Sequence, residues 1–176
     1  MTKDELEILP STTVHELLTA YPELEERLIG IAPPFKKLQN PLLRKSIAKV
    51  ATIRNIASVG SIPIDELVNK LRAEVGLAKN NKSYEDETYF TSKPAWFSAD
   101  KVSISIVEEE VQDKDKMTVV TVLREAKKLK RGEIIELITT FLPAPGIDTM
   151  RSKGYSVWTM KDEGNTIRTY FLKPQD

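Results

Sequence analysis

The residue types that carry out most covalent and metal chemistry are scarce in this chain. Its 176 residues include one histidine, His15, and no cysteine. Without cysteine there is no thiolate nucleophile, no redox-active Cys-x-x-Cys pair and no sulfur ligand for zinc or an iron–sulfur cluster. His15 lies beside Glu16 in the first turn of an expected helix, where the helix N-terminus disfavours the imidazolium form. We therefore expect a protein that is not an enzyme and that needs no cofactor.

Charged residues are a second candidate for binding chemistry. Their charge is balanced overall but unevenly distributed along the chain. Lys and Arg total 26, as do Asp and Glu, which argues against general coating of nucleic acid. Between Leu28 and Ile64, however, there is no acidic residue. The basic residues of this stretch are Lys36, Lys37, Arg44, Lys45, Lys49 and Arg54. The stretch is either a docking face for an anion or an acidic partner, or a solvated helix face that acids elsewhere neutralise.

An apolar loop precedes these bases. Residues 31–35, Ile-Ala-Pro-Pro-Phe, combine two rigid prolines with Phe35, which would lower the ordering cost of presenting the aromatic ring to a partner. The alternative is that the loop packs against its own helices. The candidate partner-binding residues are Phe35, Lys36, Lys37, Arg44, Lys45 and Lys49.

The elements that must position these residues are helical in the first half of the chain. Thr13 and Glu16 have the spacing of a capping box, and Asn40 followed by Pro41 is a typical helix start. Apolar spacing predicts four helices. The third is the longest and continues from Pro41 to near Gly60. Its expected apolar stripe comprises Leu42, Leu43, Ile47, Val50, Ala51, Ile53 and Ala57.

The third and fourth helices, joined near Gly60, have the order of a helix-turn-helix. A recognition helix needs basic residues near its N-terminus, whereas the fourth helix begins with Asp65 and Glu66. We therefore do not expect DNA binding. The helical domain is assigned to residues 1–77, and the polar stretch 78–95 to a linker.

The second half, residues 96–176, predicts the order β-α-β-α-β-β. Residues 102–106 alternate as a strand does, and residues 133–141 and the pair 155–160 and 166–172 complete the sheet. Residues 116–130 are rich in β-branched side chains but place their apolar residues on one helical face, so we assign a helix. A second helix is expected at 147–153. The fold class is α+β, with a small four-helix domain followed by a two-layer sandwich.

Both halves resemble known families. Residues 13–30 resemble the small helical domain of hybrid-cluster-protein-associated disulfide proteins and the N-terminal domain of iron–sulfur cluster repair proteins. In those relatives the loop that matches residues 30–35 carries cysteines. The second half is similar to TusA-like (SirA-like) sulfur-carrier domains in its element order, in residues 129–137 and in residues 154–158. Neither half of this chain keeps the family's cysteine.

The TusA-like resemblance implies a site near the loop 141–146. Residues that could surround a small anionic ligand there are Lys116, Phe141, Pro143, Pro145 and Arg151. The structural alternative is a packed crossover between a strand and a helix.

The sequence therefore predicts a non-catalytic binding or regulatory adaptor, in a redox or sulfur-related bacterial setting that the resemblance alone implies. A small anionic ligand held by the TusA-like half is the first alternative, and haem or metal binding through His15 is the second. We expect another protein or a small anion as partner, with a homodimer left open. No apolar run is long enough for a membrane, and acids occupy the positions where a signal peptide has bases, so we expect the cytoplasm.

Overall fold

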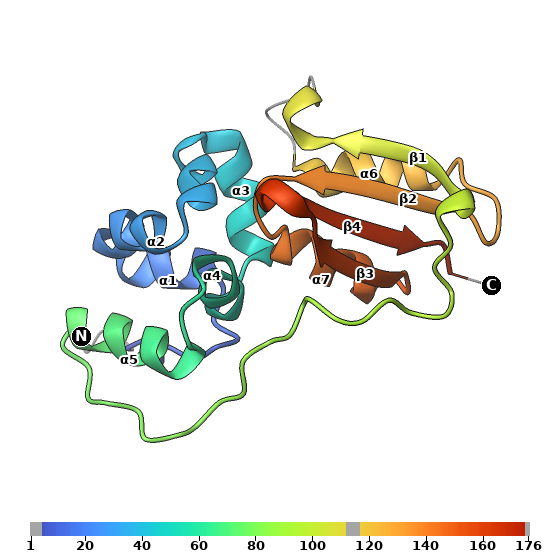
Figure 1. The fold of residues 1–176 in the computed structure, drawn as a ribbon. Helices are drawn as coiled ribbons and strands as arrows, with labels where there is room; N and C mark the ends of the chain where they lie inside the picture. The colour runs from blue at the N-terminus through green and yellow to red at the C-terminus, as the bar shows by residue number, and fades with distance from the viewer. Residues whose placement is uncertain (1–4, 112–116, 175–176) are drawn as a thin grey trace. The chain divides into compact units, whose positions relative to one another are not determined.

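The computed structural model describes residues 5–111 and 117–174. The chain forms two compact units, of which the first ends at Glu87 and the second begins at Thr88 (Figure 1). The segment predicted as a linker, 78–95, is thus divided between the units. Helices come first and a four-stranded mixed sheet with helices follows, which confirms the predicted α+β class.

The first unit packs its helices around one hydrophobic core. Its α-helices are α1 (Val14–Ala20), α2 (Glu25–Ile31), α3 (Pro41–Val50), α4 (Ile53–Gly60) and α5 (Ile64–Glu74), with 3₁₀ turns at Pro22–Leu24 and Pro33–Gln39. The predicted capping box begins α1, where the Thr13 hydroxyl accepts from the Glu16 amide and the Glu16 carboxylate accepts from the Thr13 amide. Among the core side chains, Leu17, Leu28 and Leu67 are fully buried.

The third helix is not continuous, and this corrects the sequence prediction. Ala51 and Thr52 are extended, so the backbone leaves α3 and starts again as α4. The Thr52 hydroxyl accepts from the Asn55 amide (3.3 Å), and the Asn55 side chain accepts from the Thr52 amide (2.9 Å). This second capping box supplies partners for the amides that a new helix start leaves unpaired. The break turns Ile53 and Ile56 into the core, both fully buried.

The segment predicted as a loop at residues 31–35 is also more regular than expected. Ile31 ends α2, and Pro33 begins a 3₁₀ helix that runs to Gln39. Phe35 and Leu38 are one turn apart in this helix and both are buried in the core.

The second unit has the predicted element order. It contains β1 (Val102–Val107), α6 (Thr118–Ala126), β2 (Ile134–Thr139), α7 (Ala144–Ser152), β3 (Ser156–Lys161) and β4 (Ile167–Leu172). The strand order is β1-β2-β4-β3, with β1 parallel to β2 and the other two pairs antiparallel. The helix α7 starts three residues earlier than predicted, because Pro145 fits its first turn.

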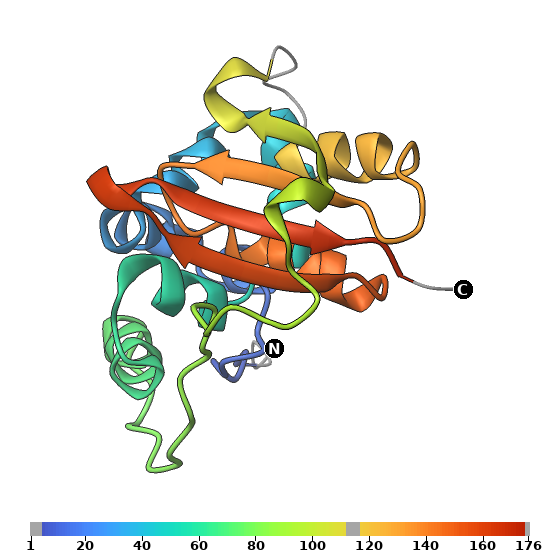
Figure 2. The ribbon, with the colours of Figure 1, turned by 45° about the vertical axis from the view of Figure 1, so that its right-hand side comes forward.

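The two faces of this sheet are covered differently (Figure 2). Within residues 116–130, the segment assigned to a helix from its apolar spacing, α6 forms as predicted. The helices α6 and α7 both pack on one face of the sheet. There Val122, Ala126 and Met150 are fully buried beside the sheet residues Ile135, Leu137 and Phe171. On the opposite face, the rings of Trp158 and Tyr170 stack at 5.3 Å, and Phe97 packs against both.

None of the helices in the described part of the chain combines the length and apolar character that crossing a membrane requires.

Candidate functional site

The structure places the predicted ligand residues in differing surroundings. Lys116 lies outside the described residues. Pro143 is buried, whereas Phe141 and Pro145 are half-buried. Arg151 lies in the last turn of α7, about 9 Å along the helix axis from Pro145 in the first turn.

The loop before α7 is engaged in packing. The Thr139 hydroxyl donates to the Phe141 carbonyl (2.6 Å), and the Thr149 hydroxyl donates to the Pro145 carbonyl (2.8 Å). A Cβ at Gly146 would lie 3.5 Å from the Cβ of Val119, so α6 and α7 approach closely here. These contacts are those of a packed crossover.

Arg151 has its own neighbours on the second unit. Its guanidinium lies 5.5 Å from the ring centroid of Tyr89, and the Tyr89 hydroxyl reaches both carboxylate oxygens of Asp148 (3.1 and 3.0 Å). Tyr89 is only 3 % exposed. The carboxylate of Asp148 makes the surroundings of Arg151 less favourable for an anion.

The basic stretch is partly neutralised in three dimensions. Arg44 donates to the Glu25 carboxylate (2.9 Å), and Arg54 donates to the backbone carbonyl of Glu85. Lys37 is half-buried, while Lys36, Lys45 and Lys49 are exposed. Phe35 is 5 % exposed and belongs to the core of the first unit, so its ring is not part of the surface.

The outer face of α3, defined by Leu42, Lys45, Lys49 and Val50, joins two of these lysines to apolar side chains. Leu42 is 57 % exposed and Val50 is 41 % exposed. Both were assigned to the buried stripe, which was wrong, because the break at residues 51–52 lets α3 bury Leu43 and Ala48 instead. Sequence reasoning found the lysines of this face but missed its apolar half.

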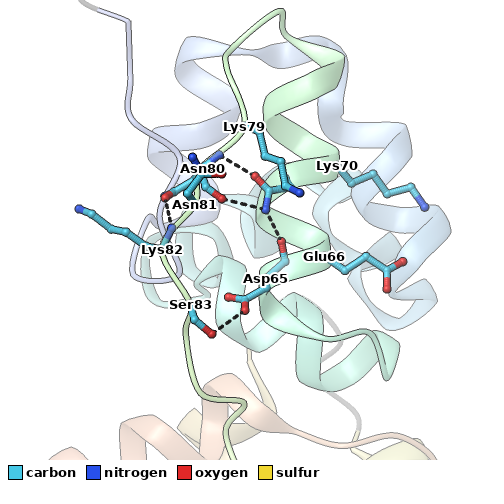
Figure 3. Close-up of a pocket in the computed structure, with 9 residues that line it drawn as sticks. Asp65, Glu66, Lys70, Lys79, Asn80, Asn81, Lys82 and Ser83 are labelled. Carbon is cyan, nitrogen blue, oxygen red and sulfur yellow. Dashed lines mark hydrogen bonds between the residues drawn. The ribbon is translucent and has the colours of Figure 1, made fainter.

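A shallow pocket of about 670 Å³ lies elsewhere in the first unit, between α5 and residues 79–83 (Figure 3). Its inner polar groups bond to each other. Asn69 accepts from the Asn80 amide (2.8 Å) and donates to the Asn80 carbonyl (3.2 Å), and Asp65 accepts from the Tyr84 amide (2.7 Å). These bonds hold the segment after α5 against the helix, and we assign the pocket no ligand.

A buried charged cluster lies on the sheet face opposite α6 and α7, and sequence reasoning missed it. Glu136 on β2 is 7 % exposed. Its carboxylate accepts from Arg168 on β4 (2.7 Å) and from the Ser105 hydroxyl on β1 (2.6 Å). Arg168 also donates to Asp162 (2.8 Å). Glu136 and Arg168, each the one charged residue of its strand, were the signal available in the sequence.

The pKa values in this cluster follow from its contacts. Burial raises the pKa of Glu136, but hydrogen bonds from Ser105, Arg168 and Tyr170 outweigh it and bring the pKa below its ordinary 4.5. Asp162 and then Glu136 raise the pKa of Arg168, while burial and Glu136 raise the pKa of Tyr170 to about 12. Glu136 is therefore held ionised and bonded on both oxygens, which favours a role in joining three strands over proton transfer.

The described residues contain no cluster of three or more His, Asp or Glu side chains that could hold a metal ion. His15 is exposed on α1, next to the carboxylate of the capping box.

Comparison with known proteins finds a family model that matches part of the chain. No curated protein and no solved structure matched the sequence. Residues 8–68, from the segment before α1 into α5, match the family DUF1858, described as a domain of unknown function.

Proposed function

We propose that this chain is a non-catalytic adaptor that binds an acidic, partly apolar segment of another protein through the outer face of α3. The observation that carries the proposal is the composition of that face. Two exposed aliphatic side chains, Leu42 and Val50, lie beside Lys45 and Lys49, which have no acidic partner among the residues that the structure describes.

The aliphatic side chains would supply the affinity of such a contact. Large apolar groups left in water stabilise a complex when a partner covers them. Leu42 and Val50 are the large exposed aliphatics of the first unit's described surface. Because Leu43 and Ala48 are buried beneath them, α3 is held in place and little order must be gained on binding.

The lysines would set the chemistry of the partner. Lys45 is one turn from Leu42 and Lys49 is one turn from Lys45, while Val50 lies about two turns from Leu42, so charge and apolar surface meet on one side of the helix. A matching segment would present carboxylates next to apolar side chains. Charge complementarity of this kind selects partners and raises association rates, and salt screens it.

A capture experiment with matched charge changes tests the proposal. The full chain is used as bait in an extract of its source cells, beside K45E/K49E, L42S/V50S and K127E/K130E. Lys127 and Lys130 are exposed on the second unit, so the last variant has the same net charge as the first. We expect each change on α3 to weaken capture about tenfold or more, whereas the control variant should behave as wild type. Equal capture by all four chains would contradict the proposal.

The alternatives predict a different result. A small anionic ligand in the TusA-like half would give a saturable thermal shift with nucleotides or organic anions, and the shift would be lost in Arg151→Ala. The position of Arg151 near Asp148 gives this alternative less support. Haem or metal binding through His15 would be lost in His15→Ala. A redox or sulfur-related setting for the adaptor is part of the proposal that the resemblance alone supports.

A further inference from the structure

The strand β1 forms one edge of the sheet and has a neighbour on one side only. The strand order is β1-β2-β4-β3, and β1 pairs with β2. The other edge, β3, is accompanied by residues 90–91, since Phe90 bridges to Thr159 and the Thr91 carbonyl accepts from the Trp158 indole (3.1 Å). Within residues 5–111 and 117–174, no segment pairs with the outer side of β1 (Figure 2).

The free edge lacks the side chains that usually block pairing. Natural edge strands carry lysine, proline or inward-pointing charge, or are covered by another segment. The sequence of β1 is Val-Ser-Ile-Ser-Ile-Val, which contains none of these residues. Its exposed residues, Ser103 and Ser105, are small and neutral, so a second backbone could approach closely. The register shift between Val102 and Ile104 affects one end and leaves residues 104–107 in regular pairing.

The charges at the two ends of β1 suggest which strand would fit. Lys101 immediately precedes β1, and Glu108–Glu110 immediately follow it. Antiparallel pairing of two copies places the start of each strand opposite the end of the other. Each Lys101 then lies near the acidic run of the second copy, and the contact occurs twice because a two-fold interface is self-complementary. Parallel pairing would instead bring the two acidic runs together.

We propose that β1 pairs antiparallel with β1 of a second copy of this chain, so that two four-stranded sheets join into one of eight strands. This interface is separate from the outer face of α3, and the homodimer does not depend on the adaptor function. A contact based on one short strand per chain is small, so the dimer should dissociate on dilution.

Sedimentation of the full chain over a range of concentrations tests the proposal, with hydrogen exchange to locate the contact. We expect a monomer–dimer equilibrium in which the β1 amides become protected as the dimer forms. Ser103→Lys should raise the dissociation constant at least tenfold, because a lysine on an edge strand opposes pairing. Ser103→Thr, at the same exposed position, should preserve the dimer. Circular dichroism of each variant establishes that the monomer remains folded.

A second pair of variants tests the orientation. Lys101→Glu should weaken the dimer, because it places like charges opposite each other, whereas Lys127→Glu changes net charge equally just after α6 and should not. A chain that stays monomeric at millimolar concentration would overturn the proposal. So would a dimer whose β1 amides exchange as fast as in the monomer, or one that Ser103→Lys and Lys101→Glu leave unchanged.

Discussion

Arg168 is the residue on which two carboxylates of the second unit depend. It bonds Glu136 on one side and Asp162 on the other, and Glu136 has little contact with water. Removing one partner of a buried pair leaves the other charge uncompensated, which costs more than the pair itself contributes. Because the Arg168 side chain is 32 % exposed, solvent screens part of this effect.

We therefore expect Arg168→Gln to lower the unfolding free energy of the second unit by about 2 kcal/mol. Both tryptophans of the chain, Trp96 and Trp158, belong to this unit, so tryptophan fluorescence during urea unfolding reports on it selectively. The double variant E136Q/R168Q should lose less than the sum of the single variants, because no buried charge remains. Arg124→Gln, which breaks an exposed pair with Glu125, is the control and should unfold as wild type. An unchanged midpoint for Arg168→Gln would show that Glu136 does not need it.

The same cluster predicts a dependence of stability on pH. The pKa of Glu136 is lower in the folded chain than its ordinary value of 4.5. Its contribution to stability is therefore complete above the unfolded pKa and is lost as the pH falls through the lower, folded pKa. Glu136→Gln has no such group, so the stability difference between wild type and this variant should shrink as the pH falls from about 5 through the lowered pKa of Glu136. A difference that stays constant over this interval, measured by the same fluorescence assay, would contradict the lowered pKa.

At the scale of the element, the join between α3 and α4 decides which side chains of the first unit face water. Periodicity alone favoured one long helix, because Leu42, Val50 and Ile53 can be placed on a single stripe. Thr52 and Asn55 have cap chemistry, but the same residue types also occur within helices, and only the surrounding core decides between the two. The helix α1 was predictable from its capping box, and α5 from the helical spacing of its buried residues Ile64, Leu67, Val68 and Leu71.

Loss of this cap should be measurable. Thr52→Ala removes the hydroxyl that accepts from the Asn55 amide, and we expect a loss of about 1 kcal/mol in the stability of the first unit. The first unit has no tryptophan, so hydrogen exchange of the α4 and α5 amides is the suitable measurement. Thr52→Ser keeps the hydroxyl and should retain most of the stability. Equal exchange rates in wild type and Thr52→Ala would mean that tertiary packing alone holds the break.

At the scale of the whole molecule, the ion pairs between distant residues say more about the basic residues than the balanced net charge does. Arg44, in the stretch without acids between Leu28 and Ile64, pairs with Glu25, and Arg27, just before that stretch, pairs with Glu74. Such pairs join residues from different helices, so a count along the sequence cannot find them. The α+β order of the second unit, by contrast, follows from local alternation and helical spacing, and it was predicted correctly. The sequence alone does not show which lysines and arginines lie apart from an acidic side chain.

The absence of cysteine is a property of all 176 residues, and it leads to the last prediction. Persulfide transfer needs a thiolate to accept the sulfur, and the chain contains none. Incubation of the full chain with a persulfide donor should therefore leave its intact mass unchanged. Pro33→Cys is the matched positive control, since position 33 is exposed at the start of the 3₁₀ helix Pro33–Gln39. This variant should gain sulfur that a reductant removes. Reductant-sensitive sulfur on the wild-type chain would contradict an adaptor without sulfur chemistry, because it would require an acceptor other than a thiol.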